Sequence, residues 1–397
     1  MVIIMKIKRF AAIILAFLLI LPSTFVLGAE TPPVVGPIAG QAAVPAVEIK
    51  GKAAILVEAS TGRVLYEKNA HEKLYPASIT KIMTELLVLE SLESGKLKWD
   101  DKLTCSEHAA SMGGSDIWLE KGEVMSVTDL FKAMTINSAN DAATLLAEKV
   151  AGSEPAFANL MNEKAKKLGM NDTHFVNCTG LDADNNLTSA YDVMLMSREL
   201  ITHKDIFNYT TIWMDTLRGG KTALYNTNKL IRFYDGANGL KTGSTSKAGY
   251  CLSATAMRDN MQLIAVVLGC EVVDDRFSAT RNLLDFAFAN WSQVSPKITS
   301  GNVKIQVLHG EKDEVVAVPD GSPSILTDKG KDKDITQKIS SVSNVMAPVI
   351  KGQVVGQITF WVDGKNVGSV ALKTNEAVGK LTFLKAFATM FLSMVGN

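Results

Sequence analysis

The order of the secondary-structure signals constrains the fold of this chain more than any single motif does. Alternating apolar residues around a turn at residues 60–62 predict a β-hairpin, and apolar residues at three-and-four spacing then predict helices to about residue 215. Strand signals resume after Gly239, and a helical run, "DRFSATRNLLDFAFANW", follows them. Strands that bracket a helical middle indicate one sheet assembled from distant parts of the chain. We therefore expect residues 48–293 to form a single α+β domain.

A change of pattern after residue 293 indicates a second, smaller domain. Residues 294–376 contain short alternating strands, such as "NVKIQVLHG" and "GQITFWVDGKNVGSVALK", and no helical period. A chain of 397 residues has room for two cores, because a single hydrophobic core stops growing near ~250–300 residues. We predict a small all-β domain here.

The last segment, residues 377–397, returns to a helical pattern with two unequal faces. Apolar residues cover most of the helix, and the polar residues form a narrow stripe of Thr382, Lys385, Thr389 and Ser393. Such a helix is too apolar for a free tail, so we predict that it anchors the protein in a membrane interface. Packing on the β domain or on a partner is the alternative.

The first residues have the composition of an export signal. Three basic residues precede an apolar block from Phe10 to Leu21, which is shorter than the ~20 residues of a membrane span. We predict a signal peptide at residues 1–29, cleaved after Gly28 or Ala29, with an uncleaved anchor as the alternative. Residues 30–47 are rich in proline and predict a linker. The protein is then expected outside the cytoplasm, peripheral on the outer face of the cell membrane.

Charge and metal-ligand spacing argue against several classes of function. Lys plus Arg and Asp plus Glu both number 41, so no excess charge favours a nucleic-acid partner. The five histidines never fall at metal-ligand spacing, and a calcium-like run at residues 182–186 lacks the glycine and the closing glutamate of a calcium loop. We expect no metal and no cofactor.

The four cysteines are scattered through the chain. Export permits disulfides, but a chain of this size needs none, so we expect buried thiols. Cys251 and Cys270 lie on two runs that would pair as a hairpin around Asp259-Asn260. A bridge between these two cysteines is the alternative.

The stretch "YPASITKIMTELLVLE", residues 75–90, contains a candidate nucleophile and its base. Ser78 and Lys81 lie three residues apart at the start of an apolar helix, so they share a face and the amine can take the hydroxyl proton. Burial and the positive end of the helix dipole both favour the neutral form of Lys81. The alternative is a helix cap at Ser78 and a solvated lysine. The pattern is weak alone, because Ser244 and Lys247 repeat it before a strand.

Two further motifs strengthen the assignment. The run "INSANDAATLLAEKV" places Ser138 and Asn140 in a polar break between two apolar helices, although a helix cap at Asn140 or Asp141 would also explain it. The triplet Lys241-Thr242-Gly243 begins a strand, where glycine lets a ligand's backbone approach closely. The order Ser-x-x-Lys, Ser-x-Asn, Lys-Thr-Gly, with separations of 60 and 103 residues, is typical of penicillin-binding proteins and class A β-lactamases.

With these motifs the sequence resembles the low-molecular-mass D-alanyl-D-alanine carboxypeptidases, the penicillin-binding serine peptidases of family S11 that trim peptidoglycan stem peptides. The resemblance covers nearly the whole chain, including "GSDIWLEKGE", "NCTGLDADN" and "APVIKGQVVG". It looks closest to the vegetative and sporulation-associated forms of Gram-positive bacteria. It implies a β-lactamase-like catalytic domain, in which helices and a helical subdomain flank a five-stranded antiparallel sheet.

The resemblance also implies a role for each motif residue. Ser78 would attack the carbonyl between the two terminal D-alanines, and Lys81 would take its proton. Ser138 would relay that proton to the departing D-alanine, while Asn140 would hold Lys81 and the substrate amide. The stem peptide would be the substrate, and a β-lactam would acylate Ser78 and stay as an inhibitor.

The third motif would bind the end of the substrate. Lys241 and Thr242, with Gly243 beside them, would hold the terminal carboxylate, because a cation and a hydroxyl match an anion. The backbone N–H groups of Ser78 and Ser244 would form the oxyanion hole.

Two departures from the family pattern fall close together. Cys178 stands where the family commonly has proline, and "NLTSA" at residues 186–190 replaces a histidine, an aromatic residue and Ser-Thr-Ala. We expect these changes to affect loop packing and substrate preference more than the reaction.

Three other functions share part of this motif pattern or of this fold. A class A β-lactamase needs Ser-Asp-Asn and a Glu-x-x-Leu-Asn loop, which the sequence lacks. A non-catalytic wall-binding protein would be expected to lose Ser78, Lys81 or Lys241, and all three are present. A D,D-endopeptidase would use the same groups as a carboxypeptidase, so the sequence leaves that choice open.

Overall fold

The computed structural model describes residues 49–299, 301–383 and 385. The predicted signal peptide and linker, and most of the predicted C-terminal helix, lie outside the described residues. Within the described ranges, no helix combines the length and apolar character that crossing a bilayer requires.

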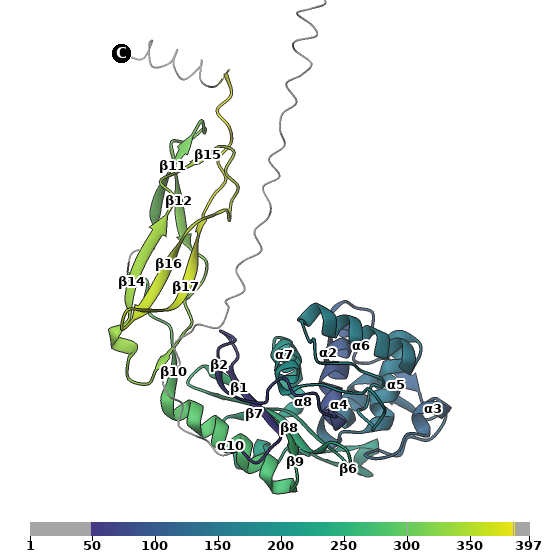
Figure 1. Ribbon diagram of the computed structural model, residues 1–397. Coiled ribbons are helices and arrows are strands. Elements are labelled where there is room, and N and C mark those ends of the chain that lie inside the picture. Colours follow the sequence, from purple (N-terminus) through teal and green to yellow (C-terminus); the bar gives the residue numbers. More distant parts are fainter. Residues whose placement is uncertain (1–48, 300, 384, 386–397) are drawn as a thin grey trace, which may run out of the picture. The chain divides into compact units, whose positions relative to one another are not determined.

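A five-stranded antiparallel sheet forms the centre of the larger domain, in the order β2-β1-β9-β8-β7 (Figure 1). Its strands are β1 (Ala53–Glu58), β2 (Val64–Lys68), β7 (Ala237–Thr245), β8 (Gly249–Arg258) and β9 (Met261–Cys270). Strand β1 pairs with β9, with Ala53 opposite Leu268. The prediction of one sheet assembled from both ends of the domain is confirmed, and β7 forms one edge of it.

Both faces of this sheet are buried, and the side-chain period of two divides β1 between two cores. Ala53, Ile55 and Val57 pack in the core that contains helices α2 (Lys81–Glu93) and α7 (Ala190–Leu200). Ala54 and Leu56 pack on the opposite face, in the core that contains α10 (Val273–Asn290). The sheet is therefore a rigid middle layer that holds α2 on one side.

The helical middle of the chain supplies the rest of the larger domain. It contains α3 (Glu107–Ala110), α4 (Val127–Asn137), α5 (Asn140–Ala151), α6 (Glu154–Leu168), α8 (Phe207–Thr210), α9 (Leu230–Phe233) and the short hairpins β3 (Lys102–Thr104) with β4 (Val124–Ser126) and β5 (Met214–Leu217) with β6 (Thr222–Tyr225). Serine side chains start four helices of the larger domain: Ser106, Ser126, Ser153 and Ser189 accept backbone N–H groups at the first turns of α3, α4, α6 and α7.

The smaller domain is all β, as predicted. Its six-stranded sheet has the order β14-β16-β17-β12-β11-β15, and β10 pairs with β13 separately. The strands are β10 (Trp291–Val294), β11 (Val303–Leu308), β12 (Glu314–Pro319), β13 (Ile325–Asp328), β14 (Thr336–Ser341), β15 (Asn344–Met346), β16 (Val354–Val362) and β17 (Lys365–Thr374). Ile305, Val315, Ile358, Phe360 and Leu372 form the centre of its core.

The β domain extends beyond the boundary expected at residue 376. Val378 forms an isolated bridge with Val349 and is only 2% exposed, and the Leu381 N–H donates to the His309 carbonyl. The prediction that the terminal helix begins at residue 377 is therefore wrong at its start, because the core of the β domain needs the Val378 side chain. The helical segment can begin only after Leu381.

The hairpin between β8 and β9 turns at Asp259 and Asn260, as the sequence predicted. Both residues have positive φ, 48° and 62°, which favours Asn and Asp at the two central positions of a tight hairpin turn. Cys251 and Cys270 are free thiols, like Cys105 and Cys178, and all four are buried. The structure thus agrees with the expectation of buried thiols and not with the alternative bridge.

Candidate active site

Ser78 lies in a short 3-10 turn, Ala77–Thr80, that leads directly into α2. Ala77 has a positive φ of 48°, which non-glycine residues rarely adopt. Neither the turn nor α2 has a side-chain cap hydrogen bond. Ser78 is therefore not a helix cap, and its hydroxyl is free for another partner.

That partner is Lys81, whose side chain is fully buried. Its Nζ lies 3.1 Å from Ser78 Oγ, 2.5 Å from Asn140 Oδ1 and 2.8 Å from the Thr179 carbonyl oxygen. A neutral amine has two protons and one lone pair. It can donate to Asn140 and Thr179 and still offer its lone pair to the Ser78 hydroxyl.

The electrostatics of the site favour this neutral amine. Burial, and after it the nearby charge of Lys241, lower the pKa of Lys81 to about 7. A base whose pKa lies near the operating pH is deprotonated often enough to act and basic enough to take a proton. The solvated lysine of the alternative interpretation is excluded by this burial.

The Ser-x-Asn motif joins α4 to α5, and its asparagine contacts Lys81. Ser138 ends α4 in the left-handed conformation, with φ 62°, and its buried Oγ has no hydrogen-bond partner among the described residues. Asn140 begins α5, and its Nδ2 donates to the Gly113 carbonyl at 2.6 Å while its Oδ1 holds Lys81. Asn140 thus connects to Lys81 directly, whereas Ser138 has an uncommitted hydroxyl.

The Lys-Thr-Gly motif lies on the edge strand β7. Lys241 is 1% exposed, and its Nζ donates to the Thr242 carbonyl at 3.2 Å. Thr242 Oγ1 donates to Thr227 Oγ1 at 2.7 Å. Burial lowers the pKa of Lys241, and Arg276 adds to this effect while Glu85 opposes it.

Gly243 also has a structural role that the sequence did not predict. A Cβ at this position would lie 3.0 Å from the Pro76 carbonyl oxygen and 3.1 Å from the Ala77 Cβ. The glycine therefore makes room for the turn that carries Ser78, and it brings the first and third motifs together.

The second Ser-x-x-Lys pair does not have this environment. The Lys247 side chain is 46% exposed, its Nζ lies 3.5 Å from Asp184 Oδ1, and it stacks on the ring of Tyr75 at 5.1 Å. Lys247 therefore has a solvated ion pair, whereas buried Lys81 contacts the part-buried Ser78 hydroxyl, and only the first pair has the geometry of a nucleophile and base.

The sequence did not predict the part that residues 177–181 play in the site. The Thr179 carbonyl is one of the three oxygens that hold Lys81. Gly180 has a positive φ of 85°, and a Cβ there would lie 1.7 Å from the Ala77 carbonyl oxygen. The Thr-Gly pair was the available signal, since a backbone contact this close requires glycine.

Cys178, one of the two departures from the family pattern, helps to fix this loop. Its thiol lies 3.2 Å from Glu154 Oε1, to which its N–H also donates at 3.1 Å. Its carbonyl accepts from Thr84 Oγ1 of α2 at 2.7 Å. The loop is thus tied to α2 next to Lys81, and the cysteine supplies contacts that a proline could not.

Asp141 is a second residue whose part the sequence did not reveal. Its carboxylate accepts the N–H groups of Leu119 at 2.9 Å and Ile117 at 3.1 Å. It therefore holds the loop between α3 and β4 against α5, beside Asn140. The cap position of α5 is instead occupied by Ala139, without a side-chain hydrogen bond.

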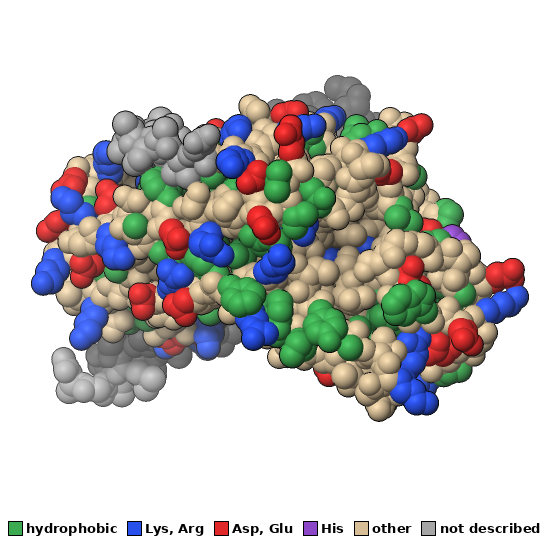
Figure 2. Space-filling model, turned by 90° about the horizontal axis from the view of Figure 1, so that it is seen from below, with side chains coloured by type: hydrophobic (Ala, Val, Ile, Leu, Met, Phe, Trp, Pro, Cys, Tyr) green, Lys and Arg blue, Asp and Glu red, His purple; other side chains and the backbone are tan. Residues whose placement is uncertain are grey.

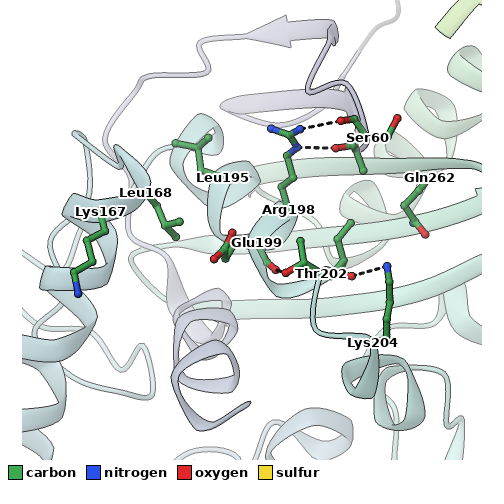
Figure 3. Close-up of a pocket in the computed structure, with 11 residues that line it drawn as sticks. Ser60, Lys167, Leu168, Leu195, Arg198, Glu199, Thr202, Lys204 and Gln262 are labelled. Atoms are coloured by element: carbon green, nitrogen blue, oxygen red, sulfur yellow. Dashed lines mark hydrogen bonds between the residues drawn. The ribbon is translucent and has the colours of Figure 1, made fainter. Parts of the chain in front are cut away.

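The surface is hollowed on one face, and apolar side chains stand around the hollow (Figure 2). A different pocket of about 620 Å³ contains none of the motif residues (Figure 3). There the Arg198 guanidinium donates to the Ala59 and Ser60 carbonyls, and Lys204 donates to the Ile201 carbonyl. The Arg198 and Lys204 side chains of this pocket already bind backbone carbonyl oxygens, which gives both residues a structural role.

One cluster of possible metal ligands occurs among the described residues: Glu90, Glu199 and His203. Lys164 Nζ donates to Glu90 at 2.6 Å and to Glu199 at 2.9 Å. The Lys164 ammonium group already bridges these two carboxylates, so the cluster does not fit a cation site.

The fold and the site together place a serine hydroxyl beside a buried lysine amine, an arrangement that is able to support acyl transfer to the serine. Residues 39–272 match the model of the D-alanyl-D-alanine carboxypeptidase family, and residues 297–380 match that of the C-terminal domain of penicillin-binding protein 5. The chain therefore belongs to the D-alanyl-D-alanine carboxypeptidase family.

Individual relatives agree with this assignment. The chain is 43% identical to D-alanyl-D-alanine carboxypeptidase DacF from Bacillus subtilis (strain 168), across 85% of this chain and 88% of that protein. It is 37% identical to D-alanyl-D-alanine carboxypeptidase DacC from Escherichia coli (strain K12), across 86% and 87% respectively. The predicted family and the predicted carboxypeptidase function are confirmed by these relatives.

Solved structures confirm the predicted fold class. Penicillin-binding protein 5 from Haemophilus influenzae superposes with a TM-score of 0.76 at 30% identity, covering 85% of this chain and all of that one (100%). Penicillin-binding protein D2 from Listeria monocytogenes, in its ampicillin-bound form, gives 0.57 at 36% identity and covers 62% of this chain and 100% of that one.

Proposed function

We propose that this D-alanyl-D-alanine carboxypeptidase removes the terminal D-alanine of peptidoglycan stem pentapeptides through an acyl-enzyme on Ser78. The observation that carries the proposal is the position of Lys81 Nζ, 3.1 Å from Ser78 Oγ and held by Asn140 and Thr179. This arrangement supports proton transfer from a hydroxyl to a neutral, immobilised amine. The nucleophile therefore needs no histidine.

Acylation follows from these groups. Ser78 Oγ transfers its proton to Lys81 and attacks the carbonyl carbon between the two D-alanines. The N–H groups of Ser78 and Ser244 stabilise the oxyanion, a device worth roughly 3–4 kcal/mol per donor. The bond to the terminal D-alanine nitrogen then breaks, and that nitrogen receives the proton from Lys81 through the hydroxyl of Ser138. The unpartnered Ser138 Oγ supports this relay.

Binding of the substrate's end is assigned to the third motif. The terminal carboxylate lies against Lys241 and Thr242, because a buried cation and a hydroxyl satisfy an anion better than water-exposed groups do. Gly243 keeps this strand against the Ser78 turn, and Asn140 contacts the substrate amide. Water, deprotonated by Lys81, finally hydrolyses the ester and restores Ser78.

Mass spectrometry of the purified protein incubated with a pentapeptide muropeptide and with a cross-linked muropeptide tests this function. We expect the pentapeptide to lose the mass of one alanine while the cross-linked species survives. Cleavage of the cross-link would instead identify a D,D-endopeptidase. Two unchanged substrates would favour a non-catalytic wall-binding protein.

β-Lactams should inhibit the enzyme by acylating Ser78. The supporting observation is that penicillin-binding protein D2 from Listeria monocytogenes, which is similar to this chain, was solved in ampicillin-bound and cefotaxime-bound forms. A β-lactam keeps its leaving group tethered, so the acyl-enzyme has no free product to release. The stem peptide and the β-lactam thus compete for the same hydroxyl.

The proposed location is the outer face of the cell membrane, reached by the signal peptide and held by the C-terminal helix. Removing residues 382–397, which spares Val378 in the β domain, should move the protein from the membrane pellet to the soluble fraction with D-alanine release unchanged. Fractionation and activity assays of both forms measure this. A truncated protein that still sediments with membranes would contradict anchoring by the helix.

A further inference from the structure

Glu85 is a buried carboxylate that none of the steps above uses. It lies on α2 one turn after Lys81, and residues at this spacing share a helix face. It is 1% exposed, and neither of its oxygens has a hydrogen-bond partner among the described residues. An unpaired carboxylate is costly to bury unless nearby positive charge compensates for it.

Two buried lysines act on this carboxyl group, and Lys241 has a larger effect on it than Lys81 has. Lys81 is fully buried on the same helix, and Lys241 is 1% exposed on β7, which contacts α2. The Thr135 hydroxyl of α4 is the other polar group that acts on Glu85. Asp116 and Cys178 also raise the pKa of Lys81. Arg276 lowers the pKa of Lys241.

The two lysines have opposite requirements in the reaction. Lys81 must be neutral to accept the Ser78 proton, whereas Lys241 must be cationic to hold the substrate carboxylate. Two buried ammonium groups repel each other, and Arg276 also disfavours the charge on Lys241. Without a nearby anion, burial would remove the charge from both lysines.

We propose that Glu85 is a positioning residue for the reaction: its carboxylate is the buried counter-charge that keeps Lys241 cationic while Lys81, one helical turn away, serves as the neutral base. The proposal rests on the proposed function of Ser78, Lys81 and Lys241. It explains why the buried first turns of α2 carry a carboxylate next to Lys81.

The pKa shifts of these groups give the direction in which removal of the Glu85 carboxylate changes the pH profile. Burial raises the pKa of Glu85, and Lys241, Thr135 and Lys81 oppose that rise. In return, Glu85 raises the pKa of Lys241 and of Lys81. Removing the carboxylate therefore lowers the pKa of both lysines, so the acidic and the alkaline limb of the kcat/KM profile both move to lower pH.

The test is the pH profile of D-alanine release by the full chain carrying Glu85→Gln. We expect both limbs to move down by about one pH unit, the size of shift that a nearby opposite charge causes. On the alkaline side of the optimum, KM for the pentapeptide should rise about tenfold while kcat changes less. Glu85→Asp, which keeps the charge, should lie closer to the wild type.

Glu93→Gln is the matched control, because Glu93 lies on the same helix but pairs with His203 at 2.7 Å on the surface. Its profile should coincide with that of the wild type. If Glu85→Gln fails to fold, Glu85→Met gives the same readout with an apolar side chain suited to a buried position. Limbs that do not move in the folded variant, or an equal loss in Glu85→Asp and Glu85→Gln at every pH, would overturn the proposal. A wild type that releases no D-alanine would instead contradict the proposed function.

Discussion

Replacing Ser78 by alanine will abolish both covalent labelling by a fluorescent penicillin and the release of D-alanine from a pentapeptide. The alanine lacks the atom that forms the acyl-enzyme, so the loss should be roughly 10⁴-fold or more. The fold should survive, because Ala77 and Ile79 on either side are fully buried and hold the turn in place. Gel fluorescence, an assay of free D-alanine and thermal unfolding measure the three quantities.

Ser246→Ala is the control for this variant. Ser246 is an exposed serine near the third motif whose hydroxyl contacts only Asp182, at 3.5 Å. Labelling and D-alanine release should therefore match the wild type. Undiminished release by Ser78→Ala would remove Ser78 from the role of nucleophile, whatever the relatives of the chain do.

The sheet was predictable because its strands carry their own signal. β1 is a short continuous apolar run whose two faces are buried in separate cores, and such a run is visible in the sequence without any partner strand. That strands from both ends of the domain share one sheet was inferred from their order along the chain, and this order does not say that β1 pairs with β9. The register, with Ala53 opposite Leu268, depends on packing against α2 and α10, which the pattern does not contain.

The site was predictable where side chains act and was missed where the backbone acts. Ser78, Lys81 and Asn140 belong to short motifs, and the structure brings these three within hydrogen-bond distance. The Thr179 carbonyl completes the environment of Lys81, but every residue has a carbonyl, so no residue type marks it. Gly180 was the nearest signal, since only glycine tolerates the contact with Ala77.

Three features that the sequence did not reveal have the same physical origin. Gly243 makes room for the Ser78 turn. The boundary at residue 376 was expected from periodicity, and Val378 belongs to the β domain because its side chain fills a core formed by distant residues. Glu85 was passed over because it stands in an apolar run, where a single carboxylate changes the pattern little. Each case depends on a neighbour far away in the sequence.

Replacing Lys81 by methionine should lower the rate of acylation about 10²–10⁴-fold, the range that a positioned general base contributes. The effect is smaller than that of Ser78→Ala because the nucleophile and the oxyanion hole remain. In the wild type, kcat/KM should rise as the pH is raised through about 7, where buried Lys81 loses its proton. That acidic limb should disappear in the variant, and stopped-flow acylation by a chromogenic cephalosporin across pH measures both effects.

Lys247→Met makes the same chemical change in the other Ser-x-x-Lys pair of the chain. Lys247 is half exposed and bound to Asp184, so its removal should leave the acidic limb in place. The comparison separates sequence pattern from environment: both lysines follow a serine by three residues, but only Lys81 is fully buried. A persistent acidic limb near pH 7 in Lys81→Met would show that another group accepts the proton. Loss of the limb only in Lys81→Met would mean that desolvation by α5 and the Thr179 loop makes an ordinary lysine into the base.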